Sequence, residues 1–166
     1  MRDHELDVPG LAALMEGADH VDVRTVTGTL SLRAFVASTL SYQPAWMTFL
    51  YHVRGGVVRL LGMRQDGVPQ SVRFSPDDVP LEPGAEFLFF TVHSAEDDRY
   101  WIGGFVDQHL TGHVVAAVEA SGDGARRLHL MTIVHYNNWA GPVYFGLIRP
   151  FHHLIVRLAT NAAVRG

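Results

Sequence analysis

The chain has 166 residues, of which 48% are hydrophobic and 18% are charged, and its formal net charge is −4 with neutral histidines. This composition excludes general disorder and predicts one globular domain over residues 1–166. The basic residues are scattered, which argues against a nucleic-acid partner, because phosphates demand a concentrated basic face. The sequence has no cysteine, so disulfides, thiolate metal ligands and thiol nucleophiles are excluded.

Location and lysine chemistry are also constrained. No apolar run reaches the roughly 18 residues that a membrane-spanning helix needs. The first ten residues, MRDHELDVPG, lack the pattern of a signal peptide. A cytoplasmic protein without membrane insertion is therefore expected. All 13 basic residues are Arg, which excludes Schiff-base catalysis by a lysine and suggests a GC-rich bacterial genome.

The first part of the chain predicts three helices and a strand. A short helix is expected over residues 8–17, a strand over 20–27, and a second helix from Ser31 to about Leu40. Residues 44–62 predict a longer amphipathic helix, since Trp, Phe, Leu and Val recur there at spacings of three and four. Its two central glycines suggest a kink.

The next part of the chain has the period of a sheet. Strands are expected over residues 71–74, 86–94, 99–108, 112–120 and 126–136. The gaps between the last four are too short for helical crossovers, so they predict an antiparallel meander. Gly103 and Gly104 indicate a bulge or bend inside one strand. His93 and the acidic residues at 96–98 are typical of a solvated hairpin tip.

The chain ends in a predicted long helix with a proline in its middle. Pro150 should kink it between Gly146 and Pro150. Helical spacing puts apolar residues on one stripe, which is expected to face the sheet: Tyr144, Ile148, Phe151, Ile155, Leu158 and Ala162. His152 falls at the edge of this stripe. His153 falls on the opposite, polar side with Arg149 and Arg157.

A curved antiparallel sheet wrapped around a long kinked C-terminal helix is an α+β arrangement. It resembles the helix-grip fold of START lipid-transfer domains, polyketide cyclases and the major birch pollen allergen. Three segments are also similar to a bacterial family of unknown function that occurs fused to NAD-dependent epimerase-like domains: GADHVDVRTV (17–26), YQPAWMTFLYHVRGGVVRLLGM (42–63) and NNWAGPVYFGLIRPFHHLIVRL (137–158). The resemblance implies a fold with a pocket and supplies no reaction.

The pocket of such a fold would lie between the sheet and the C-terminal helix. The residues predicted to bind an apolar ligand there are Trp101, Phe105, His135, Trp139, Tyr144, Ile148, Phe151 and His152. In strand 126–136 both faces are apolar, so alternation leaves open which face meets the helix. If the face with His129 and His135 lines the pocket, His135 is a candidate general base.

Other chemistry finds little support in the sequence. His109 and His113 have the spacing of a helical zinc pair, but they straddle a hairpin turn, and no HExxH motif occurs. No metal and no cofactor are therefore expected. Neither a G-x-S-x-G nucleophile elbow nor a glycine-rich phosphate loop is present.

Three functional hypotheses remain. The first is a protein without catalytic activity that binds a small hydrophobic molecule in the cavity. The second is an enzyme of the cyclase or dehydratase type that uses His135, His152 or Tyr144 as acid–base groups. The third is an interaction module that acts through its surface, as a homodimer or as the partner of a separate reductase.

Overall fold

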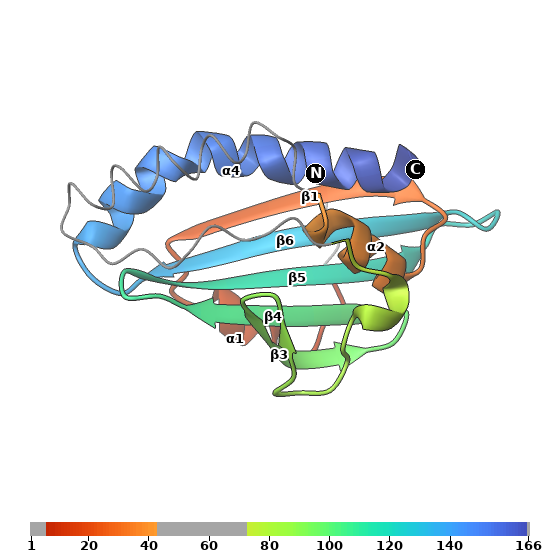
Figure 1. Cartoon of the computed structure of the whole chain (residues 1–166), viewed down its shortest axis with the longest axis horizontal. Helices are drawn as coiled ribbons and strands as arrows, with labels where there is room; N and C mark the ends of the chain where they lie inside the picture. The colour runs from red at the N-terminus through yellow and green to blue at the C-terminus, as the bar shows by residue number, and fades with distance from the viewer. Residues whose placement is uncertain (1–5, 43–72, 166) are drawn as a thin grey trace.

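The computed structural model describes residues 6–42 and 73–165, and it divides the described chain into three α-helices, one 3-10 turn and six strands (Figure 1). In chain order these elements are α1 (Leu11–Met15), β1 (His20–Gly28), α2 (Leu32–Leu40), η1 (Pro76–Asp78), β2 (Glu86–Phe87), β3 (Phe90–Glu96), β4 (Tyr100–Val106), β5 (Leu110–Ala120), β6 (Arg126–Tyr136) and α4 (Ala140–Arg165). The helix predicted over residues 44–62 lies outside the described residues.

The six strands form one sheet in the order β1-β6-β5-β4-β3-β2, and every neighbouring pair is antiparallel. The meander predicted from the short connections is therefore confirmed. The first strand, β1, is an edge strand that pairs with β6, with His20 opposite Val134 and Gly28 opposite Arg126. This pairing brings the start of the chain beside its last strand and next to α4.

The strand predicted over residues 86–94 is wrong as a single element. It is two strands, because the chain reverses at Leu88 and Phe89, and Phe87 pairs with Phe90. Leu88 has a φ of 58°, a left-handed conformation that turns usually assign to Gly, Asn or Asp. The sequence carries none of these residues there, so it gave no turn signal. The strand predicted at 71–74 is also wrong for residues 73 and 74, which belong to no element.

The two central glycines of β4 do not form the predicted bulge. The register between β4 and β5 is continuous, and the irregularity lies in β3 instead, between Val92 and Ser94. Gly103 makes room for the indole ring of Trp101, since a Cβ there would lie 2.2 Å from a ring carbon. These glycines are therefore packing positions for aromatic rings.

The sheet has two covered faces. On the inner face α2 and α4 pack over an apolar core that includes Phe35, Trp101 and Leu128, and Figure 1 shows both helices on this side. On the outer face the short α1 covers a second cluster around Leu11, Ile102 and Ile133. Strand β6 therefore turns Leu128 and its alternate neighbours inward and turns His129, Met131, Ile133 and His135 outward.

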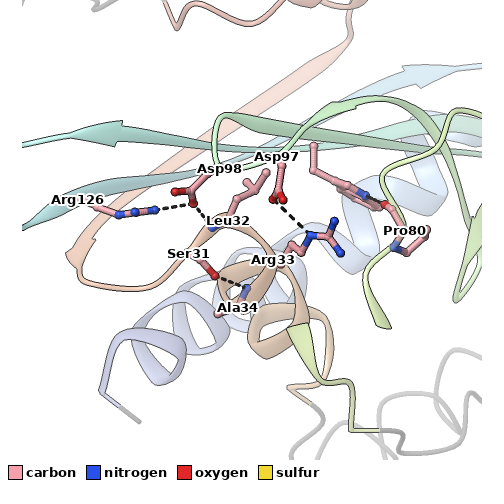
Figure 2. Close-up of polar contacts among 9 residues, drawn as sticks. Ser31, Leu32, Arg33, Ala34, Pro80, Asp97, Asp98 and Arg126 are labelled. Atoms are coloured by element: carbon pink, nitrogen blue, oxygen red, sulfur yellow. Dashed lines mark hydrogen bonds and ion pairs between the residues drawn. The ribbon is translucent and has the colours of Figure 1, made fainter. Parts of the chain in front are cut away.

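The acidic turn between β3 and β4 fixes the start of α2 to the sheet (Figure 2). The Asp98 carboxylate accepts hydrogen bonds from the Leu32 backbone N–H at 3.2 Å and from the Arg126 guanidinium at 2.5 Å. The latter bond is the main reason why the pKa of Asp98 is lowered. Asp97 pairs with Arg33 at 3.3 Å. Both aspartates lie exposed in the turn, as predicted for a solvated hairpin tip, and they also hold the start of α2 against the sheet.

The side of α4 that packs on the sheet differs from the apolar stripe that helical spacing predicted. Its buried residues include Gly141, Tyr144, Phe145, Val156, Ala159, Thr160 and Ala163. Small residues allow the helix to pack closely, whereas Phe151, in the predicted stripe, is 43% exposed. Figure 1 shows the first turns of α4 inclined to the rest, a bend of the kind expected where Pro150 removes a helical hydrogen bond. Within the described residues, no helix is both long enough and apolar enough to cross a membrane.

Candidate functional site

Polar side chains line the contact between β1 and the middle of α4. We call them the β1–α4 polar cluster, and its members are His20, Asp22, Arg24, Arg149, His152 and His153. The three β1 residues alternate along the strand and so share the inner face with Gly28, whose α-carbon region abuts Val164 of α4. The helix supplies the other three from consecutive turns.

The members of the cluster contact one another directly. The His153 Nδ1 atom lies 3.3 Å from Asp22 Oδ2, and the Arg149 Nε–H donates to His153 Nε2 at 3.3 Å. The ring of His20 packs against His153, with centroids 5.3 Å apart. The predicted place of His153 on a solvated helix face is therefore wrong, since its side chain is only 28% exposed and meets β1.

The cluster holds most of the unpaired buried polar atoms in the described part of the chain. Seven buried side-chain nitrogen or oxygen atoms have no hydrogen-bond partner among the described residues. Four of them belong to the cluster: His20 Nε2, Asp22 Oδ2, Arg24 Nε and His152 Nδ1. Buried polar atoms nearly always have a partner, because leaving one unpaired costs about 1–3 kcal/mol. Within the described part of the chain, this cluster therefore holds the largest group of buried polar atoms that are free to accept or donate a hydrogen bond.

Burial lowers the pKa of two histidines of the cluster, His152 and His20. Desolvation is the largest cause that lowers the pKa of His152, to about 4, and the positive charge available to His153 adds to it. Desolvation also lowers the pKa of His20, followed by the charge of Arg149. Near pH 7 both rings are therefore uncharged and can each donate or accept a hydrogen bond.

The buried His152 should make folding stability depend on pH. Its pKa is about 4 in the folded protein against 6.5 as the reference value, so the unfolded chain binds the extra proton between these values. The free energy of unfolding is then highest above pH 6.5 and falls as the pH drops toward 4, by about 3 kcal/mol from this group. The charges of Asp22, His20 and His153 also act on the His152 ring. All three groups are retained when His152 alone is replaced.

Urea unfolding of the wild-type protein and of His152→Leu, near pH 7 and near pH 4.5, checks this expectation. The loss of stability on acidification should be smaller in the variant by about 2–3 kcal/mol, because the other groups remain. An equal loss in both proteins would contradict a buried neutral His152.

An apolar cluster adjoins the polar one on the inner face. It comprises Leu110, Val134, Tyr144 and Phe145, with Phe105, Tyr136 and Ile148 packed against it. Phe145 joins the two clusters, since its ring lies 4.9 Å from His20 and 6.2 Å from His152. Phe105 packs against both this cluster and the main core. The inner face thus carries apolar and polar groups side by side under the first half of α4.

Five of the predicted ligand residues lie on this inner side. Phe105, Tyr144 and Ile148 belong to the apolar cluster, and His152 belongs to the polar one. Trp101 is fully buried in the main core, where its Nε1–H donates to the Pro80 carbonyl at 3.0 Å. Its packing makes Trp101 a structural residue of the core.

Three predicted ligand residues are placed elsewhere. His135 lies on the outer face of β6, with Nε2 at 3.2 Å from the Glu16 carbonyl oxygen. Trp139 precedes α4 and is 84% exposed, and Phe151 on α4 is 43% exposed. These three side chains therefore do not join the buried clusters of the inner face: alternation along β6 places His135 on the outer face, and the rotation of α4 leaves Phe151 largely exposed. The acid–base trio His135, His152 and Tyr144 is consequently split between two faces.

The sequence reading missed His20, Asp22 and Arg24. Their alternation in HVDVR was visible, but alternating polar residues on a strand usually face solvent. The signal that would have found them is the second polar patch, Arg149 and His153, on the helix that lies parallel to β1. Only the pairing of β1 with β6 brings the two patches together.

The outer face carries a separate row of histidines. The rings of His93 and His113 are 5.0 Å apart and those of His113 and His135 are 6.3 Å apart. Gly104 makes room for them, as a Cβ there would lie 2.5 Å from His93. Burial, and then the two neighbouring rings, lower the pKa of His113. Among the described residues, no group of three His, Asp or Glu side chains is arranged to hold a metal ion.

A curved antiparallel sheet with a long C-terminal helix across its inner face is the helix-grip architecture, and the chain is a protein of this class. It belongs to the family described as "Protein of unknown function (DUF2867)", which matches residues 14–159. None of the curated proteins matches the chain.

Two solved structures are similar over most of the chain. One is the crystal structure of Ara h 8.0201, at 9% identity and a TM-score of 0.43, covering 89% of this chain and 99% of that one. The other is the Mll3558 protein from Rhizobium loti, at 12% identity and a TM-score of 0.45, covering 87% and 96%. The fold class stands on the strand order and the helix described above.

Proposed function

We propose that the protein binds a small, largely apolar molecule between α4 and the inner face of the sheet, and that it does so without catalysing a reaction. The apolar part of this ligand would pack on the cluster around Tyr144 and Ile148. Its polar end would meet the β1–α4 polar cluster. The protein would act in the cytoplasm, and neither a nucleic acid nor a membrane is needed as a partner.

The observation that carries this proposal is the set of four unpaired buried polar atoms beside an apolar cluster. Small-molecule sites are generally apolar with a few convergent polar groups. A ligand with one polar end would satisfy these atoms and bury its remaining surface, a gain of about 25 cal/mol for each Å² of apolar area. Among the described residues, these four atoms have no hydrogen-bond partner.

Binding of the uncharged fluorescent probe N-phenylnaphthylamine tests the proposal. Its emission should rise on addition of the protein and saturate at one probe per chain. Ile148→Trp, which puts a larger side chain against the apolar cluster where the ligand would pack, should weaken binding about tenfold or more, equivalent to about 1.4 kcal/mol. The matched control is Val23→Ala, which alters the outer face of β1 between Asp22 and Arg24 and should leave binding unchanged. Probe binding that is absent, or equal in all three proteins, would contradict the proposal.

The alternatives from the sequence receive less support. An acid–base enzyme needs its groups within reach of one another, and His135 is separated from His152 and Tyr144 by the sheet. A homodimer stays a prediction, for which the mass in solution as a function of concentration is the test.

A further inference from the structure

We propose that the ligand carries a single carboxylate, and that Arg24 and Arg149 bind this group together with the unpaired ring nitrogens of His20 and His152. This inference rests on the proposed function, because it names the chemical class of the ligand at the same site. The polar cluster contains two guanidinium groups and one carboxylate, Asp22. Among the described residues, neither Arg24 nor Arg149 forms an ion pair with an acidic side chain.

The tautomer of His153 strengthens the charge argument. A ring nitrogen that accepts a hydrogen bond carries no proton, so the bond from Arg149 to Nε2 puts the proton of His153 on Nδ1. Nδ1 lies 3.3 Å from Asp22 Oδ2, although no hydrogen bond joins these two atoms. The Asp22 carboxylate thus lies against His153 and forms no ion pair with either arginine within the described residues. The charge of Arg24, with its unpaired buried Nε, has no counterpart within the described residues.

The donors of the cluster also outnumber its acceptors. Arg24 offers several N–H groups, and the neutral rings of His20 and His152 can each present an N–H at the unpaired nitrogen. Among the unpaired atoms of the cluster, Asp22 Oδ2 is the one that can only accept. A carboxylate supplies two acceptor oxygens, and its bonds to arginine are charge-assisted and stronger than neutral ones.

The carboxylate of Asp22 limits how much negative charge a ligand in this cluster should carry. With two arginines and one aspartate, the cluster has a net charge near +1 when its histidines are neutral. A monoanion neutralises this charge, whereas a doubly charged phosphate would face Asp22 with excess negative charge. The site should therefore prefer a carboxylate to a phosphate monoester on the same chain.

Binding of an anion should be linked to proton uptake. The groups that face the two rings are Asp22 and Arg24 from β1, and Arg149 and His153 from α4. A carboxylate beside His20 and His152 favours their charged forms. Affinity for the carboxylate should consequently rise as the pH falls from about 7 to about 5.5, where the ligand-bound rings begin to take up a proton and the ligand itself is still mostly ionised.

Competition against bound N-phenylnaphthylamine tests the inference with three probes of equal chain length: decanoate, decyl phosphate and decanol. We expect decanoate to displace the dye about tenfold better than decanol or decyl phosphate near pH 7. In Arg24→Gln and Arg149→Gln the advantage of decanoate over decanol should fall to about threefold or less. Arg127→Gln, on the outer face of β6, is the matched control and should keep it. Arg149 is exposed on α4, so its variant keeps the fold and carries the test by itself.

The outcomes separate the two proposals. Equal displacement by decanoate and decanol would overturn the carboxylate inference and leave the proposed function standing. Tighter binding of decyl phosphate would overturn the preference for a single charge. A decanoate preference that survives in both arginine variants would overturn the placement of the carboxylate. Failure of the dye and of all three probes to bind would overturn the inference and the proposed function together.

Discussion

Replacing Trp101 by alanine should lower the free energy of unfolding by about 4 kcal/mol. The indole is fully buried in the main inner core, where Phe87 and Phe90 pack edge-on against it at 6.2 Å. Truncation removes this packing and leaves a large cavity. It also leaves the Pro80 carbonyl without its donor, since the Trp101 Nε1–H donates a hydrogen bond to it at 3.0 Å.

Urea unfolding followed by far-ultraviolet circular dichroism measures this loss. Trp101→Phe is the matched variant, because it keeps an aromatic ring in the core and removes mainly the hydrogen bond to Pro80. It should cost about 1–2 kcal/mol. A cost below about 1 kcal/mol for Trp101→Ala would mean that the indole does not hold α2 and η1 on the sheet.

Replacing Gly103 by alanine should also destabilise the protein, by about 2–3 kcal/mol, although the change adds only a methyl group. The new Cβ would lie 2.2 Å and 2.6 Å from two carbons of the Trp101 ring. Neither β4 nor the buried indole can shift without disturbing the core. Overpacking against a fixed neighbour is therefore the expected mechanism.

Two comparisons isolate that mechanism. Gly146→Ala on α4, where no described atom lies within 4 Å of the new Cβ, should stabilise the helix by up to about 1 kcal/mol. In a Trp101→Phe background, Gly103→Ala should cost about 1 kcal/mol or less, because the smaller ring lacks the atoms that clash. Additive effects of the two substitutions would show that the ring and the glycine do not share the space.

The fold was predictable where local signals were strong. Strand 126–136 was predicted with the bounds of β6, and the short connections predicted the antiparallel order. Positions that depend on tertiary contacts were not predictable in the same way. Leu88 adopts a turn conformation although it is not a residue type that turns favour. Gly103 is required because the ring of Trp101 packs against it, and neither hydrophobic periodicity nor turn propensity predicts that contact.

The candidate site was half predictable. Its apolar half followed from helical spacing, which placed Tyr144 and Ile148 on the side of the sheet. The polar half could not be predicted, because His20 and Asp22 come close to the polar residues of α4 only when β1 pairs with β6 and lies along the helix. The prediction that His135 lines the pocket had a different difficulty. Strand alternation is symmetric, and only the position of α4 decides which face of β6 is inside.

The most direct test of the account is an NMR titration of the His152 imidazole in the protein alone and with saturating decanoate, with the signal assigned by comparison with His152→Leu. A buried anion site predicts a His152 pKa of about 4 without ligand, raised by roughly one unit or more when the carboxylate is bound. A pKa near 6.5 in the free protein, or one that decanoate leaves unchanged, would contradict a buried site for an anion between β1 and α4.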